Sequence, residues 1–240
     1  MIRAPRLKVP TRSTRGRALR CCGHAVFIGV VVSWLSACAS TPEPLLIALP
    51  AAARGTSAPD VVGAAQPEPG TAGTLLVRRL SLPEYMVARR VRYTTDAARL
   101  AEWPNAVWAE RVEVGMAREL VSALREALPA WRVCDASCGD LVPDITLKVD
   151  LQRLDVLRRA GHLIASAQIQ LGSSKHGATD THPPETTMFT FEQSLPADTA
   201  QGQAEAMTEL VRSIARMGAA AVLHSRAVWP AGPAERPSPR

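Results

Sequence analysis

The sequence lacks the short motifs on which many enzymes build their active sites. It contains no glycine-rich phosphate loop, no Gly-x-Ser-x-Gly elbow and no His-Glu-x-x-His helix. Paired carboxylates at Glu110 and Glu113 stand beside Arg111 and Arg118, which suits a solvated helix face. The histidines that could bind a metal share no common spacing: His162, His176, His182 and His224. We therefore expect no catalysis, no bound metal and no other cofactor.

A hydrophobic run long enough to span a bilayer is also missing from the N-terminal region. The apolar stretch at residues 25–37 has 13 residues, whereas a membrane-spanning helix needs about 20. No acidic residue precedes Glu43, and the first 20 residues carry seven basic ones. A basic start, a short apolar stretch and a small-residue ending are typical of a secretory signal. An uncleaved anchor, or a signal peptide followed by a chance cysteine, are the alternatives.

The end of this region resembles a bacterial lipobox, Leu35-Ser36-Ala37-Cys38. Small residues at Ser36 and Ala37 let an extended backbone enter a peptidase cleft, and Cys38 supplies the nucleophile that is acylated. Two or more acyl chains attach a protein stably to a membrane. We predict that residues 1–37 are removed and that Cys38 carries the lipid. Ala39 follows in place of the aspartate typical of inner-membrane retention, which implies an outer-membrane anchor facing the periplasm.

The excess of positive charge belongs largely to the predicted signal. The whole chain has 28 Lys and Arg against 22 Asp and Glu, for a net charge of +6. Removing residues 1–37 leaves 21 basic and 22 acidic residues, for a net charge of −1. A basic surface for phosphate backbones is therefore not supported, and we expect no nucleic-acid partner.

Few cysteines remain after this processing. Cys21 and Cys22 leave with the signal and Cys38 is acylated, so Cys134 and Cys138 are left. An oxidising periplasm favours a disulfide, although closing so short a loop contributes only about 2 kcal/mol. A metal site would need further ligands, which the sequence does not place nearby. We favour the disulfide.

The remaining chain divides by composition. Residues 38–73 are rich in Ala, Gly, Pro and Thr and predict a flexible tether behind the lipidated cysteine. Their apolar patch at residues 45–49 has a second interpretation, as an edge strand that returns onto the domain. Residues 74–228 are patterned throughout and suit one domain. Residues 229–240 are rich in proline and predict a frayed tail.

Hydrophobic periodicity predicts an α/β fold. Apolar residues at helical spacing indicate two long helices, over residues 106–128 and 199–226. Alternation of apolar and polar residues indicates strands near residues 74–80, 89–95, 145–152, 161–171 and 188–192. We predict a single-domain sandwich in which a mixed β-sheet is covered by the two helices.

One block of sequence resembles the ABC-type transport auxiliary lipoproteins. It runs from Leu82-Pro83-Glu84-Tyr85 through Arg90-Val91-Arg92-Tyr93 to Trp108-Ala109-Glu110, which in that family opens the long first helix. The likeness spans residues 74–225 and the lipobox. Arg111 stands where the family often has proline, and Leu45-Leu46-Ile47 stands where many members carry tyrosines.

The resemblance implies a non-catalytic component of an intermembrane phospholipid transport system, with a compact α/β fold. The implied partners are a periplasmic MCE-domain protein and its inner-membrane complex, some of which are driven by an ABC ATPase. Two alternatives remain: a structural or assembly lipoprotein that partners an outer-membrane protein, and an enzyme acting on envelope polymers.

Four residues of this block are candidates for a partner interface. Trp103 precedes Pro104 in a predicted turn, and exposed aromatic side chains are favoured binding anchors. Tyr85, Arg90 and Arg92 can lie on the same surface. Trp108 falls in the apolar stripe of the first predicted helix and is assigned to the core.

Overall fold

The long strand β6, Ile145–Leu157, joins the two halves of the sheet. In the computed structural model of the chain, residues 43–51, 68–96, 99–173 and 185–228 are described. One side of β6 pairs along its length with antiparallel β7, His162–Ser173, which pairs with β8, Glu185–Ser194. The other side meets two parallel strands, β2 (Gly73–Val77) at the start of β6 and β3 (Arg90–Asp96) at its end.

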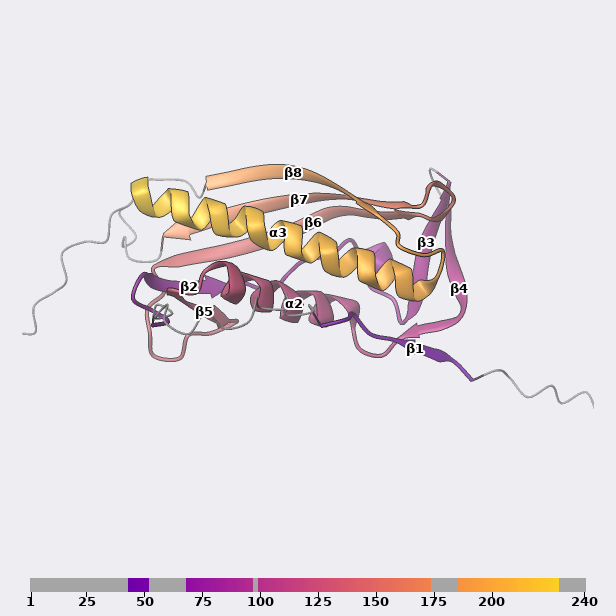
Figure 1. Cartoon of the computed structure of the whole chain (residues 1–240), viewed down its shortest axis with the longest axis horizontal. Coiled ribbons are helices and arrows are strands. Elements are labelled where there is room, and N and C mark those ends of the chain that lie inside the picture. The colour runs from indigo at the N-terminus through magenta and orange to yellow at the C-terminus, as the bar shows by residue number, and fades with distance from the viewer. Residues whose placement is uncertain (1–42, 52–67, 97–98, 174–184, 229–240) are drawn as a thin grey trace, which may run out of the picture. The chain divides into compact units, whose positions relative to one another are not determined.

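Three further strands extend the sheet outward from β2 and β3. Strand β5, Trp131–Asp135, runs parallel to β2 and forms one edge. Strand β4, Arg99–Trp108, runs antiparallel to β3, and the short β1, Leu45–Ile47, pairs in parallel with β4. The path through the sheet is β1-β4-β3-β6-β2-β5, with β7 and β8 branching from β6. Figure 1 shows β1 and β5 far apart at the ends of this path.

Two helices cover one face of the sheet. Helix α3, Ala200–Val228, lies across β6, β7 and β8, with α2, Val112–Ala127, packed beside it (Figure 1). Each helix buries a stripe of apolar side chains at helical spacing, and both stripes join one continuous core: Met116, Leu120 and Leu124 from α2 and Met207, Leu210 and Ile214 from α3. The alternate strand residues, such as Lys148 and Gln152 of β6, are exposed on the opposite, open face.

The start of α3 is fixed by a side-chain cap and a close backbone approach. The hydroxyl of Thr199 accepts a hydrogen bond from the backbone N–H of Gly202 at 3.0 Å, as an N-cap threonine does. A Cβ at Gly202 would lie 2.3 Å from the backbone oxygen of Ala197. Only glycine fits this first turn.

The predicted α/β fold is confirmed, as are the second helix and the strands within residues 74–171. The short apolar patch forms an edge strand at Leu45–Ile47, which was the second of its two interpretations. Among the described residues, no helix is long and apolar enough to cross a bilayer. The predicted lipobox, with Cys38, and the predicted tail at residues 229–240 lie outside the described residues.

The predicted first helix began too early. Residues 106–108 belong to β4, and α2 begins only at Val112, so Trp108-Ala109-Glu110 precedes the helix. Arg111 occupies the N-cap position, but its side chain makes no capping hydrogen bond to the helix backbone. Strand β5 alternates between buried and exposed residues, but it was missed because it has only five residues and begins two residues after Pro129, which ends the helix.

Candidate partner interface

Strand β3 separates its side chains between the core and the open face. Val91 is fully buried, while its neighbours Arg90 and Arg92 point to the other face, since successive residues of a strand alternate. The Arg90 side chain is 56% exposed, and Arg92 is half-buried. Two of the predicted interface residues therefore share the open face.

Glu102 of β4 lies between these two arginines. Its carboxylate is 3.4 Å from Nε of Arg90 and 3.5 Å from Nε of Arg92. Arg92 also donates a hydrogen bond to the backbone oxygen of Tyr85 at 3.2 Å. Exposed ion pairs contribute at most about 1 kcal/mol to stability, and one carboxylate cannot neutralise two guanidinium groups. The Glu102 network, defined as Tyr85, Arg90, Arg92 and Glu102, keeps a net positive charge at the surface.

Tyr85 is fixed within the domain by its hydroxyl group. Tyr85 lies in η1, Glu84–Met86, and its hydroxyl accepts a hydrogen bond from the backbone N–H of Leu154 at 3.0 Å. The same hydroxyl donates to Asp155 Oδ1 at 3.1 Å. Burial is the main reason that the pKa of Tyr85 is raised, so the phenol stays protonated and keeps this donor. Tyr85 thus holds η1 against β6 and supports Arg92 through its backbone.

The expectation that Trp103 is exposed in a turn is wrong. Trp103 lies within β4 and is only 5% exposed. Its indole Nε1 donates a hydrogen bond to Oε1 of Gln203 at 2.7 Å, and Nε2 of Gln203 donates to the backbone oxygen of Arg92 at 2.8 Å. Trp103 is therefore a core residue that fastens α3 to the sheet.

Arg158 packs against the aromatic rings of Trp103 and Tyr93. The guanidinium carbon of Arg158 lies 4.3 Å from the ring centre of Trp103 and 5.1 Å from that of Tyr93, whose rings are 5.0 Å apart. Asp198 holds Arg158 through its carboxylate at 2.7 Å. The hydrogen bond from Arg158 lowers the pKa of Asp198, so this carboxyl stays ionised. Sequence reasoning missed Arg158, Asp198 and Gln203, because no local motif links residues 40 to 100 positions apart.

A pocket of about 360 Å³ lies where β4 turns into α2. Arg118 donates a hydrogen bond to Glu110 at 2.7 Å, so the two residues pair as expected, although Glu110 precedes α2 and does not lie on a helix face. Glu113 differs from that expectation, because it is buried: Oε1 pairs with Arg111, and Oε2 has no partner among the described residues. The pocket walls mix apolar and charged side chains: Val87, Ala88, Arg89, Trp108, Ala109, Glu110, Arg111, Val112 and Glu113.

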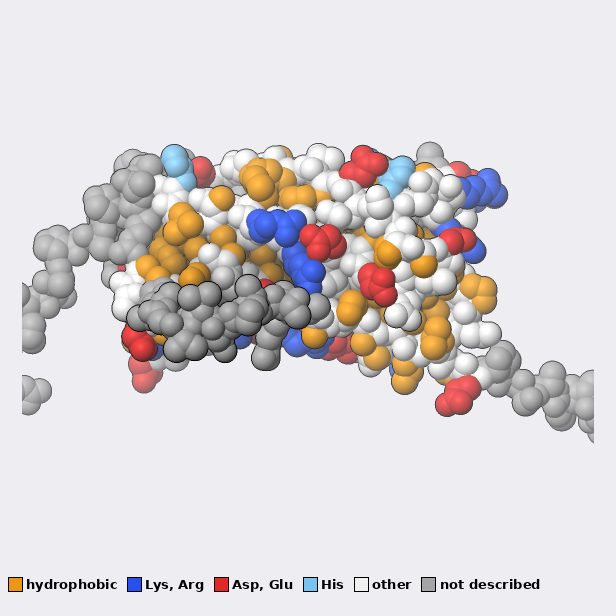
Figure 2. Space-filling view, in the orientation of Figure 1, with side chains coloured by type: hydrophobic (Ala, Val, Ile, Leu, Met, Phe, Trp, Pro, Cys, Tyr) orange, Lys and Arg blue, Asp and Glu red, His pale blue; other side chains and the backbone are white. Residues whose placement is uncertain are grey.

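The helix face carries its own paired charges. Glu209 binds Arg212 at 3.3 Å and Arg216 at 3.1 Å along α3. Figure 2 shows charged side chains of both signs near the middle of α3 and hydrophobic side chains toward its C-terminal end, where Met217 and Leu223 are exposed. Because one glutamate serves both arginines here too, charge alone does not single out the Glu102 network. We single out the Glu102 network because it lies near β1, and β1 is the described strand nearest in sequence to the predicted anchor.

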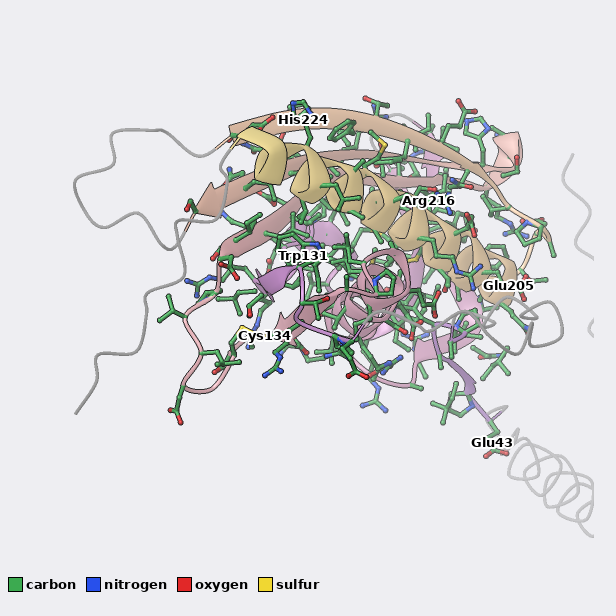
Figure 3. The ribbon with its side chains drawn as sticks, turned by 60° about the vertical axis from the view of Figure 1, so that its left-hand side comes forward. Glu43, Trp131, Cys134, Glu205, Arg216 and His224 are labelled. Carbon is green, nitrogen blue, oxygen red and sulfur yellow. A yellow bond between two sulfur atoms is a disulfide. The ribbon has the colours of Figure 1, made fainter. Side chains whose placement is uncertain are left out.

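The predicted disulfide between Cys134 and Cys138 is present, with 5.2 Å between the two Cα atoms. It ties the end of β5 to the following loop, on the same strand as Trp131 (Figure 3). Within the described residues no three His, Cys, Asp or Glu side chains gather as a metal site would require. The cysteine pair is a local staple at the β5 edge.

Comparison with known proteins agrees with this fold. The sequence profile of a family described as ABC-type transport auxiliary lipoprotein component matches residues 57–217. Protein XCC0632 from Xanthomonas campestris is similar in structure, with 13% identity, a TM-score of 0.53, and coverage of 78% of this chain and 97% of that one. The crystal structure of an uncharacterized protein has 18% identity and a TM-score of 0.50, covering 66% and 95%. No curated protein matches the chain in sequence.

Proposed function

Because the chain belongs to the family of ABC-type transport auxiliary lipoprotein components, we propose that it is a lipid-anchored, non-catalytic accessory of an intermembrane phospholipid transport system. The family match over residues 57–217 is the observation that carries this proposal. The lipobox-like Leu35-Ser36-Ala37-Cys38 supports it independently, since that part of the chain precedes the matched residues.

The anchor in this proposal is an acylated Cys38 in the outer membrane, with the folded domain facing the periplasm. Anchoring confines the domain to a thin layer beside one membrane. That confinement raises its effective concentration for a partner that reaches the same layer, so a weak contact suffices.

The proposed partner is a periplasmic MCE-domain protein together with its inner-membrane complex. We assign its contact to the exposed part of the Glu102 network, where Arg90 is the most accessible cation. An acidic surface on the partner would complement the net positive charge of this network, which favours fast and selective association. Tyr85 acts here by holding the network in place, and Trp103 belongs to the core beneath it.

A crosslinked pull-down from whole envelopes tests this assignment. The acylated chain should recover an MCE-domain protein, and Arg90→Glu should reduce that recovery strongly. Arg79→Glu is the matched control, because it makes the same charge change at an exposed arginine outside the network.

The two variants separate the possible results. Equal loss with both would show a non-specific charge effect and contradict the assignment to Arg90. Recovery of an outer-membrane protein alone, without an MCE-domain protein, would instead support an assembly role and overturn the transport proposal.

A further inference from the structure

The edge strand β1 exposes apolar side chains at the end of the sheet. Leu45 is 59% exposed and Leu46 is 61% exposed, although Ile47 in the same strand is buried in the core. In the sheet register Leu46 pairs with Val107 of β4, and Val107 pairs with Arg90 of β3. Paired residues point to the same face, so Leu46, Val107 and Arg90 form a row that passes from apolar to cationic.

Other exposed apolar side chains lie at this end of the domain. The backbone N–H of Ala109 binds the oxygen of Ile47 at 2.7 Å, which places the β4–α2 connection beside β1. Val114 in the first turn of α2 and Val87 at the pocket wall are both exposed. These side chains extend the apolar surface of β1 toward the pocket.

Cations surround this apolar surface. Arg89 and Arg111 line the pocket, and Arg90 ends the row that begins at Leu46. Within the described part of the chain, the Arg89 side chain has no hydrogen bond or ion pair. Exposed leucines next to arginines are the combination found at membrane surfaces, where apolar groups enter the interface and cations meet lipid phosphates.

The length of the connecting chain brings this end close to lipid. Cys38 precedes Leu45 by seven residues, which span at most about 25 Å when fully extended. An acylated Cys38 therefore keeps β1 within about 25 Å of the bilayer surface. We propose that the surface formed by Leu45, Leu46, Val87, Val114 and Arg89, the β1 surface, docks on an anionic phospholipid membrane.

The inference rests on the acyl anchor of the proposed function, and it adds the orientation in which the domain sits on the membrane. With the β1 surface against lipid, Arg90 marks the border of the membrane contact. The rest of the Glu102 network continues along β3 and β4 away from that contact. The partner surface and the membrane surface are then adjacent but separate.

A fluorescent probe on single cysteines tests the orientation. The full-length acylated protein is bound to vesicles of phosphatidylethanolamine and phosphatidylglycerol, with the environment-sensitive dye NBD attached to Leu46→Cys. The native cysteines do not react, because Cys134 and Cys138 form a disulfide and Cys38 is blocked by its acyl groups. Val142→Cys is the matched control, since Val142 is 65% exposed on the loop that follows β5 at the opposite edge of the sheet.

We expect the label at residue 46 to brighten several-fold on the vesicles and to be quenched by spin-labelled lipid, while the label at residue 142 stays unchanged. Arg89→Glu should reduce the signal at residue 46, and Arg79→Glu should not. Equal signals at residues 46 and 142, or a silent label at residue 46, would overturn the docking proposal.

Vesicle flotation distinguishes a failure of the docking proposal from a failure of the proposed acyl anchor at Cys38. Protein that floats with the vesicles while residue 46 stays in water refutes the docking and leaves the anchor standing. Protein that does not float at all refutes both.

Discussion

Gln203 and Trp103 lie 100 residues apart and share a buried hydrogen bond of 2.7 Å between the indole Nε1 and the amide oxygen. The amide nitrogen of Gln203 also donates to the backbone oxygen of Arg92. One side chain of α3 thus satisfies a donor of β4 and an acceptor of β3. This bond is the reason that a tryptophan with a polar edge is stable inside the core.

Replacing Gln203 by alanine should therefore destabilise the domain. Gln203→Ala leaves two buried polar groups without partners, at a cost of about 3 kcal/mol in the free energy of unfolding. Urea unfolding followed by circular dichroism measures this. Gln201→Ala, at an exposed position of the same helix turn, is the control and should change the midpoint little. Equal effects of the two variants would contradict the role given to Gln203.

The entry of α3 should not tolerate a side chain at residue 202. Gly202→Ala would place its Cβ 2.3 Å from the oxygen of Ala197, and relieving that overlap should cost about 3 kcal/mol. Thermal unfolding compares it with Gly172→Ala, where no atom lies within 4 Å of the added Cβ. A Gly202→Ala variant as stable as the Gly172→Ala variant would show that the chain before α3 yields easily.

The Cys134–Cys138 disulfide should contribute modestly to stability. Five residues lie in the closed loop, counting both cysteines, so chain entropy predicts a loss of about 2 kcal/mol on reduction. The urea midpoint measured with and without dithiothreitol gives this difference. A Cys134→Ser/Cys138→Ser variant should match the reduced protein and should not respond to dithiothreitol. A midpoint that is independent of reductant in the native protein would argue against the staple.

Asp198 should support folding in a pH-dependent way. Its pKa is lowered in the folded state from the usual 3.8, chiefly by the hydrogen bond from Arg158. A carboxyl whose pKa is lower in the folded state stabilises the fold fully when the pH is above its pKa in the unfolded chain. This contribution is lost as the pH falls through its pKa in the folded chain. The difference in unfolding midpoint between the native chain and Asp198→Asn should therefore be present at pH 7 and shrink below about pH 4. Asp140→Asn, in the exposed loop after the disulfide, is the control. A difference that stays constant down to pH 2 would contradict the ion pair.

The long helix and the half-buried strands could be predicted because their signals are local. The stripe of α3 repeats over residues 199–226, and Thr199 with Gly202 marks its start. Cys134 and Cys138 could be paired because only two cysteines remain beyond the predicted anchor. In each case a short stretch of sequence contains the whole of the pattern.

Trp103 could not be placed correctly from the sequence, because its surroundings come from distant segments. Pro104 suggested a turn, yet it lies in β4 where the pairing with β3 jumps from Glu102 to Val107. A bulge of this kind leaves residues without ladder partners, so the missing N–H of proline costs nothing there. The residues that enclose Trp103 are Arg158 and Gln203, and no local pattern brings them to it.

Strand β6 also governs how the domain assembles. The pairs β2–β5 and β3–β4 do not touch each other in the sheet and are joined only through β6, whose residues follow all four strands in the chain. The local β6–β7–β8 meander can form early, whereas the parallel pairings of β2 and β3 with β6 must close long stretches of chain. Until β6 has been synthesised, the strands that precede it form two pieces of sheet with no pairing between them. In the lipoprotein proposed above, the acylated end precedes in the chain the strand that unites the domain, so membrane attachment can come before folding is complete.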